Sequence, residues 1–225
     1  MAWYSDEAPV PGELRTEEFL LRPLRAADAE LDYDAVIDSR ELLLVYSSGR
    51  WPAEGFSLAD NRADLAMHER EHEARAAFTY TVLTPDGARC LGCVYIHPLR
   101  PMLRRLVGRG DYAAIPGAED AARDDPAWGD VRDDEALVRF WVRPECVAAD
   151  LDRRLLAALL AWFAREWPFS RVAFLANRNQ RRLLQLFADA GLRQRYTVET
   201  PKEPRAYHIC GRDSREGAPA GPYSS

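Results

Sequence analysis

Apolar and polar positions along the chain follow two periods, one typical of strands and one of helices. Runs rich in apolar, aromatic and β-branched residues predict strands, at 17–24, 77–84, 89–98, 135–142, 171–176, 192–199 and 206–210. Apolar residues at helical spacing predict helices, at 26–46, 58–76, 153–167 and 180–190. Ser57 and Asn179 are the expected N-caps of the second and fourth helices, and Gly191 is expected to end the fourth. The Pro85-Asp86-Gly87 turn predicts that the second and third strands form a hairpin.

This order of elements bounds the fold and the domain organisation. Strands and helices are mixed around a central hairpin, which predicts an α+β sheet covered by helices rather than a doubly wound parallel sheet. Residues 16–210 form one predicted domain, preceded by a loose arm over 1–15 and followed by a disordered tail over 211–225. Residues 100–134 are a long, acidic insertion, because 9 acidic residues and two arginines lie between 111 and 135.

Charge and hydropathy exclude several classes of protein. The net charge is −6, which does not suit a nucleic-acid-binding protein with a basic face. No apolar run approaches the roughly 18 residues that span a bilayer, and the N-terminus lacks a basic region followed by an apolar one. We therefore expect a cytoplasmic protein that partners neither membrane nor nucleic acid.

Two motifs have the spacing of metal ligands. Cys90 and Cys93 form a C-x-x-C pair within a predicted strand, where residues three apart point to opposite faces. His68 to His72 reads H-E-R-E-H on a predicted helix, but its neighbours are charged and no third-ligand pattern follows. The sequence therefore predicts no metal site at either motif. A charged, solvated helix face is the favoured interpretation of the second.

The segment 135–167 is a strand, a turn and a strongly apolar helix, and it is the first place to expect an anion. The start of such a helix aims unpaired N–H groups at one point. This turn, however, contains no glycine and carries Asp150 and Asp152. Leu151, Leu155, Leu159, Leu160 and Phe163 are predicted to be the core face of the helix.

The same segment resembles a known family. Val142-Arg143-Pro144 closes a central strand, Leu155-Leu156 opens an amphipathic helix about ten residues later, and Asn177, Asn179, Leu183, Leu186-Phe187 and Gly191-Leu192 follow. With the segment TEEFLLRPLRAADAE near the N-terminus, this pattern over residues 17 to 210 is similar to the GNAT superfamily of acetyl-CoA-dependent N-acetyltransferases. The resemblance implies a mixed, mostly antiparallel sheet with helices on both faces.

The resemblance also implies a site for acetyl-CoA. Phe140, Trp141 and Val142 would bind the pantetheine arm along the central strand. The pyrophosphate loop of the family, Q/R-x-x-G-x-G/A, falls on residues 147–152, where none of its motif positions is met. The implied cofactor-binding set is completed by Val147, Ala148, Ala149, Arg153, Arg154, Asn177 and Asn179.

Two departures from the family pattern bear on activity. Asp150 and Asp152 either cap the helix and occupy electrostatically the place of a pyrophosphate, or lie beside one held by backbone N–H groups and offset by Arg153 or Arg154. Phe187 stands where many members have a tyrosine that protonates the departing thiolate.

The expected reaction is acetyl transfer from acetyl-CoA to a primary amine, of a small molecule, a protein N-terminus or a lysine. Glu135 on the central strand is a candidate general base, and His97 at the end of its own strand is a rival. The alternative is a degenerate GNAT domain that binds another small ligand or a protein partner. The sequence leaves the oligomeric state open, a homodimer included.

Overall fold

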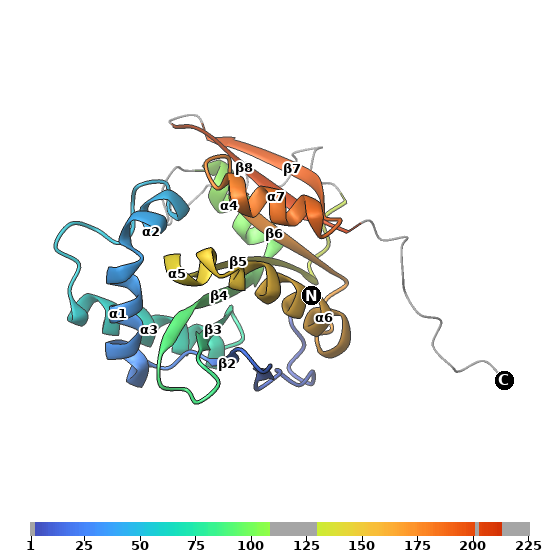
Figure 1. Cartoon of the computed structure of the whole chain (residues 1–225). Coiled ribbons are helices and arrows are strands. Elements are labelled where there is room, and N and C mark those ends of the chain that lie inside the picture. The colour runs from blue at the N-terminus through green and yellow to red at the C-terminus, as the bar shows by residue number, and fades with distance from the viewer. Residues whose placement is uncertain (1–2, 109–129, 201–202, 213–225) are drawn as a thin grey trace.

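An eight-stranded sheet organises the described part of the chain (Figure 1). The structure, a computed structural model, describes residues 3–108, 130–200 and 203–212. The strands are β1 (Leu14–Arg15), β2 (Leu20–Pro23), β3 (Phe78–Leu83), β4 (Cys90–Pro98), β5 (Glu135–Val142), β6 (Arg171–Asn177), β7 (Arg193–Thr200) and β8 (Glu203–Gly211). The helices are η1 (Ala26–Asp28), α1 (Ala29–Asp38), α2 (Arg40–Tyr46), α3 (Leu58–Glu73), α4 (Leu99–Gly108), α5 (Pro144–Ala148), α6 (Leu151–Glu166) and α7 (Arg181–Asp189).

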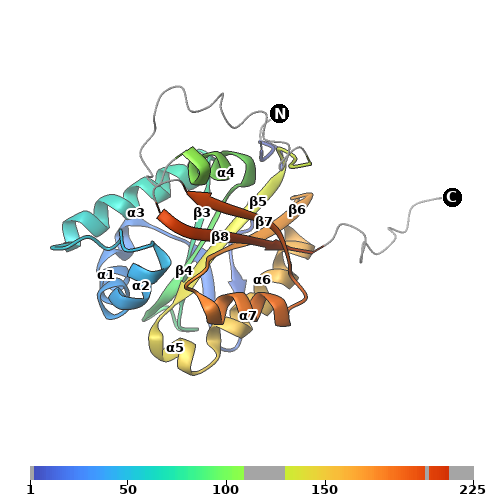
Figure 2. The same cartoon turned by 90° about the horizontal axis from the view of Figure 1, so that it is seen from above.

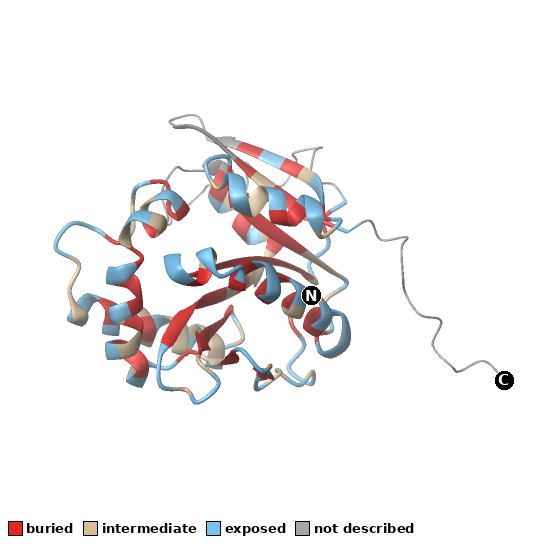
Figure 3. Ribbon diagram, in the orientation of Figure 1, coloured by how far each residue is buried: buried red, intermediate tan, exposed pale blue. Residues whose placement is uncertain are grey.

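The sheet is mixed and mostly antiparallel, as the sequence predicts. Its strand order is β1-β2-β3-β4-β5-β6-β8-β7. β5 and β6 form a parallel pair, whereas β4 pairs antiparallel with β5, and β8 antiparallel with β6. Every residue of β5 is buried (Figure 3), which identifies it as the central strand.

Helices cover both faces of this sheet (Figure 2). One face packs against α6 and α7, whose buried side chains include Leu155, Leu159, Trp162, Phe163, Leu186 and Phe187. The opposite face packs against α1, α2 and α3 over β4 and β5, and against α4 over the strands that follow. Of the core residues predicted in α6, Leu160 is only half-buried and the others are buried. Among the described residues, no helix has both the length and the apolar character needed to cross a bilayer.

Local signals in the sequence explain most helix ends. Ser57 caps α3 as predicted, through a capping box in which its side chain accepts from Asp60 N and Asp60 accepts from Ser57 N. The expected cap at Asn179 is wrong by one residue, because α7 begins after Gln180, which makes no side-chain cap hydrogen bond. Gly191 follows α7 with φ +74°, the left-handed conformation that glycine adopts most readily.

Two terminal or inserted segments differ from expectation. The arm over 1–15 is not loose where it is described, because Tyr4 is buried, Trp3 Nε1 donates to the carbonyl of Arg75 at 2.7 Å, and residues 14–15 form β1. The predicted insertion starts as helix α4, whose Leu103 is buried in the core. Residues 109–129 of that insertion, and residues 213–225 of the predicted tail, lie outside the described residues.

The predicted placement of Cys90 and Cys93 on opposite faces of their strand is wrong, for a clear physical reason. Cys90 pairs with Leu83 while Gly92 pairs with Val82, so β4 contains one extra residue, a β-bulge. The bulge shifts the alternation of side chains, and Cys90 and Cys93 consequently lie in the same buried cluster instead of on opposite faces. Gly92, next to the bulge, lies very close to β5, since a Cβ on Gly92 would lie 2.0 Å from the carbonyl oxygen of Trp141.

A fully buried arginine fixes the end of β5 to the helical layer. Arg143 follows β5, and its guanidinium binds Asp34 at 2.5 Å, Asp38, and the carbonyl oxygen of Cys90 at 2.7 Å. Both aspartates lie on α1, so α1 is tied to the bulge of β4 and to the end of β5. A buried cation of this kind depends on its partners, because an uncompensated charge in the interior is costly.

This dependence gives an asymmetric prediction. The double variant Asp34→Asn with Asp38→Asn leaves the Arg143 charge buried without a counter-ion, and should lower the free energy of unfolding by about 3–5 kcal/mol. Arg143→Met removes the charge itself and leaves two half-exposed carboxylates, so its cost should be clearly smaller. Urea denaturation of the three proteins tests this order, and a larger loss in Arg143→Met than in the double variant would contradict it.

Candidate functional site

The central parallel pair of strands separates partway along its length. β5 and β6 are paired from Glu135 opposite Arg171 to Val138 opposite Phe174, and their pairing ends there. β5 continues to Val142 paired with β4, and β6 continues to Asn177 paired with β8. Within the described sheet, the second half of β5 therefore has a strand neighbour on one side only.

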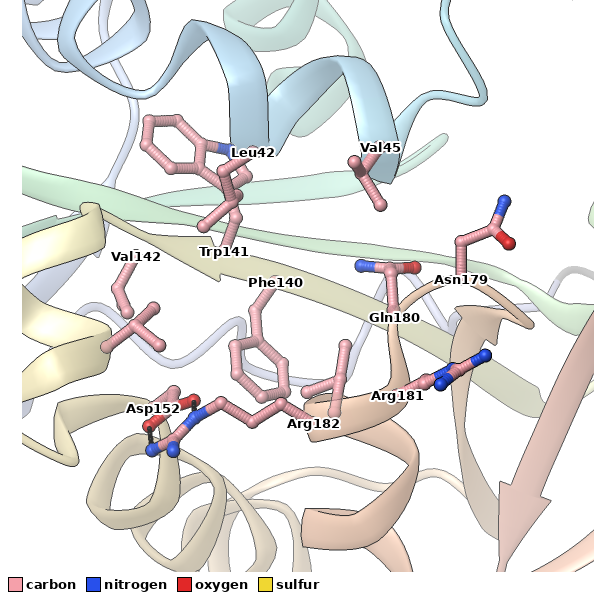
Figure 4. Close-up of a pocket in the computed structure, with 12 residues that line it drawn as sticks. Leu42, Val45, Phe140, Trp141, Val142, Asp152, Asn179, Gln180, Arg181 and Arg182 are labelled. Atoms are coloured by element: carbon pink, nitrogen blue, oxygen red, sulfur yellow. Dashed lines mark hydrogen bonds and ion pairs between the residues drawn. The ribbon is translucent and has the colours of Figure 1, made fainter.

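A pocket of about 320 Å³ occupies this separation (Figure 4). β5 contributes Phe140, Trp141 and Val142, α2 contributes Leu42 and Val45, and the start of α7 contributes residues 180–183. Val147, Asp152 and Asn179 complete the lining. Val45 remains 45% exposed although it is apolar, so part of the pocket surface is open to solvent. The shape and lining suit a slender, largely apolar ligand with a polar end.

Polar groups gather where α6 and α7 begin, beside the pocket. Asp150 precedes α6 with φ +58°, the left-handed conformation in which glycine is the usual residue. Its carboxylate does not cap the helix. The predicted N-cap position of Asp150 is therefore correct, whereas the predicted capping hydrogen bond is absent.

Both aspartates bind one arginine from α7. Arg182 Nη2 donates to Asp150 at 2.7 Å. Its Nη2 and Nε also donate to Asp152, at 2.8 Å and 2.7 Å (Figure 4). These hydrogen bonds raise the pKa of Arg182, with Asp152 the larger cause, and the Arg182 hydrogen bond lowers the pKa of Asp150. Arg182 from the neighbouring helix thus offsets one of the two negative charges at the helix start.

The two arginines expected to offset these aspartates have other partners. Arg153 Nη1 binds Asp189 at 3.0 Å, and Arg154 Nε binds Glu18 at 2.6 Å. Their charges nevertheless help to lower the pKa of Asp150, as smaller causes than Arg182, and their role beside a bound phosphate stays a prediction. Arg182 was not among the candidates because its partners lie 30 and 32 residues away, and a helical pattern does not specify such a contact.

The turn before α6 uses several of its own N–H groups internally. Val147 N donates to the carbonyl of Arg143, Ala149 N to that of Glu145, and Asp150 N to that of Val147. Ala148 ends the short helix α5, where the sequence predicts a turn. Neither Ala148 nor Ala149 lines the pocket, although both belong to the predicted loop.

The two predicted asparagines have different positions. Asn179 lines the pocket. Asn177 is buried, and its side-chain amide donates to the carbonyl of Val45 at 2.6 Å while its side-chain oxygen accepts from Asn179 N at 2.9 Å. Asn177 therefore joins the end of β6 to α2 and supports the pocket wall without lining it.

The two candidate bases lie outside the pocket lining. Glu135 is fully buried at the start of β5 and pairs with Arg171 at 3.1 Å; burial raises its pKa. Glu135 precedes Phe140 by five residues, or about 17 Å along a strand. His97 faces the helical layer on the other side, and burial, with Arg139 and His68 nearby, lowers its pKa to about 3. The roles of both as base stay predictions.

The H-E-x-x-H histidines do not converge on one point. His68 binds Glu71 through Nδ1 at 3.2 Å and meets the ring of Tyr95, whereas His72 meets the rings of Phe78 and Tyr80. In the described ranges, no group of three or more His, Cys, Asp or Glu side chains could hold a metal. The prediction of a solvated face is wrong for these two side chains, because both are half-buried against the sheet.

Comparison with known proteins gives a fold assignment. The sequence matches no protein-family model and no curated protein. The structure is similar to that of ribosomal-protein-S5-alanine acetyltransferase from Vibrio fischeri, with a TM-score of 0.63, 11% identity, and coverage of 93% of this chain and 100% of that one. It is also similar to the microcin C7 self-immunity acetyltransferase MccE in complex with acetyl-CoA and AMP, with a TM-score of 0.64, 9% identity, and coverage of 92% and 99%.

A third structure extends the same likeness. RimL, a ribosomal L7/L12 α-N-protein acetyltransferase in complex with coenzyme A, has a TM-score of 0.62 and 11% identity, with 88% of this chain and 94% of that one covered. All three are acetyltransferases, and each is covered over nearly its whole length. The strand order, the separation of β5 from β6 and these likenesses together identify the fold of this chain as that of the GNAT acetyltransferases.

Proposed function

We propose that this protein transfers an acetyl group from acetyl-CoA to a primary amine. The observation that carries the proposal is the pocket between the separated halves of β5 and β6. Past Val138 the backbone of β5 has no strand on its β6 side, so an extended pantetheine arm could add to it as a further strand would. That acetyltransferases of this fold bind CoA or acetyl-CoA supports the same assignment.

The pocket lining suits the pantetheine arm, and its edge suits the phosphates. Phe140, Val142, Val147 and Leu183 supply apolar surface. In the proposal the thioester lies near Trp141, and the diphosphate lies between the starts of α6 and α7. Arg181 and Arg182 would then supply the positive charge that glycine N–H groups supply in the family motif.

The acceptor is proposed to be a primary amine on a small molecule or a peptide. It would approach the thioester from the side of the sheet that α2 and α3 cover, because the donor pocket is bounded on its other side by α6 and α7. A neutral amine nitrogen attacks the carbonyl, the tetrahedral intermediate collapses, and the CoA thiolate leaves. Phe187 is buried against Phe174 and has no proton to give to that thiolate.

A second candidate function is favoured by one observation, the Asp150–Asp152–Arg182 cluster. The charged side chains of this cluster occupy the place where the diphosphate is proposed to bind. A domain of this fold that binds another small ligand or a protein, and transfers no acetyl group, would have the same pocket. The ligand tests below separate the two candidates.

Acetyl-CoA should raise the melting temperature of the wild-type protein. A ligand that binds only the folded state stabilises it by about 2.7 kcal/mol at a hundred times its Kd. ADP, which lacks the pantetheine arm, should give a much smaller shift, because most of the proposed contact area is apolar. Differential scanning fluorimetry measures both shifts. The absence of an acetyl-CoA shift, or an equal shift with ADP, would favour the second candidate.

Charge at the start of α6 and α7 should set the affinity for acetyl-CoA. Asp150→Gly removes a negative charge, leaves Arg182 with Asp152 as its one carboxylate partner in the cluster, and keeps the left-handed backbone accessible, so the Kd should fall several-fold. Arg181→Ala should raise the Kd by up to about fivefold, the value of an exposed ion pair. Isothermal titration calorimetry measures both, with Arg165→Ala at the far end of α6 as the matched control. Weaker binding by Asp150→Gly would refute this view of the carboxylate.

A further inference from the structure

We propose that His68, oriented by Glu71, is the general base that deprotonates the acceptor amine. This inference rests on the proposed acetyl transfer and assigns a role to a motif that holds no metal. Both residues lie on α3, on the side of the helix that faces the sheet.

The geometry of the pair is that of an oriented imidazole. Glu71 Oε2 lies 3.2 Å from His68 Nδ1. With the Nδ1 proton donated to the carboxylate, Nε2 keeps the lone pair that can accept a proton. The His68 hydrogen bond is the largest cause of the lowered pKa of Glu71, so the carboxylate is held charged beside the ring. A carboxylate that fixes the tautomer of a histidine and stabilises its protonated form is the arrangement found in catalytic triads.

Two contacts connect this pair to the donor pocket. The His68 ring lies 5.5 Å from the Tyr95 ring, between centroids. The Tyr95 hydroxyl accepts a hydrogen bond at 3.4 Å from Nε1 of Trp141, and Trp141 lines the pocket. His68 therefore lies two side chains from the proposed position of the thioester, on the face from which the acceptor is proposed to approach.

Solvent can reach the pair, which a base for a diffusing substrate requires. The side chains of His68 and Glu71 are 19% and 32% exposed. The two candidates from the sequence are less suitable. His97 has a pKa of about 3 and holds a proton poorly at neutral pH, and Glu135 is buried against Arg171 at the other end of β5.

The charge around His68 is mixed, with acidic groups nearest. Burial raises the pKa of Asp32 to about 6, and the nearby His68 opposes this shift. Burial also raises the pKa of Asp64, and His68 opposes that shift as well. The titratable and charged groups that act on His68 and its partner come from three helices and one strand: Asp32 on α1, Asp64 and Glu71 on α3, Arg105 on α4, and Tyr95 and His97 on β4.

The proposed step accounts for every proton. The ammonium form of the acceptor gives one proton to His68 Nε2, which passes it to solvent. The nitrogen lone pair then forms the C–N bond, and the C–S bond breaks with its electron pair on sulfur. The second proton of the nitrogen neutralises the CoA thiolate. The products are the N-acetyl amine, CoA thiol and one released proton.

The pH dependence of His68→Gln is the test. CoA thiol release from acetyl-CoA is followed with a thiol reagent, using as acceptors butylamine, a peptide with a free N-terminus, and an N-acetylated peptide with one lysine. At neutral pH His68→Gln should lose roughly 10²–10⁴-fold in kcat/KM for the amine. The loss should shrink as the pH approaches the amine's own pKa, roughly 10 for a lysine side chain, because the free amine then needs no base.

Two variants serve as comparisons. Glu71→Gln should show a smaller loss with the same pH trend, since it removes the orienting carboxylate and leaves the base. His72→Gln, one turn further along α3 and packed on Phe78 and Tyr80, should retain wild-type kcat/KM. All variants should keep the acetyl-CoA thermal shift, because none of these side chains lines the donor pocket.

The outcomes separate this inference from the proposed function. If His68→Gln keeps the wild-type kcat/KM, or loses the same factor in kcat/KM at every pH, the role of His68 is overturned. The proposed acetyl transfer would still stand. A wild-type protein that releases no thiol with any of the three acceptors would overturn both.

Discussion

The arrangement of the site depends on one constraint, which is that β5 and β6 are held apart by their outer neighbours. β4 binds β5 as far as Val142, which pairs with Gly92, and the buried Arg143 ties that end of the strand to the carbonyl of Cys90. On the other side, β8 binds β6 to Asn177, whose amide is tied to α2. Neither strand can move toward the other without breaking these contacts. The backbone of β5 is therefore left available to a ligand, and the pocket is a consequence of the sheet rather than of a flexible loop.

The polar end of the pocket has a left-handed residue before α6, a conformation that glycine adopts most readily. Here that residue is Asp150. Its carboxylate and that of Asp152 share one arginine, Arg182 from α7, which offsets one of the two negative charges. Three N–H groups before α6 are already bonded within α5 and its turn, so in the proposed function the positive charge for a phosphate comes from α7. An arginine fork can exchange a carboxylate for a phosphate, which makes the cluster compatible with binding as well as with exclusion.

Local sequence patterns were sufficient to predict most helices and strands. They did not predict contacts between residues distant in the sequence. The hairpin, the Ser57 cap, the Gly191 stop and the apolar face of α6 follow from period and turn chemistry. The pocket residues on β5 were expected only from the resemblance to the GNAT family. Three features escaped because each depends on tertiary context. The bulge that places Cys90 and Cys93 together is a register shift, the pairing of Arg182 spans two helices, and the inward orientation of His68 overrides the charged appearance of its helix. Helix α4, which is basic and apolar, was missed because its residues were grouped with the acidic, small-residue stretch that follows them.

The central claim is that the gap beside β5 holds the acyl donor. The most direct measurement is a crystal structure of the protein grown with acetyl-CoA. The account predicts the pantetheine arm extended along Arg139–Val142, hydrogen-bonded to the backbone of β5, with the diphosphate against Arg181 and Arg182. A ligand bound elsewhere, or a pocket left empty at saturating acetyl-CoA while the Asp150–Asp152–Arg182 cluster stays intact, would contradict it.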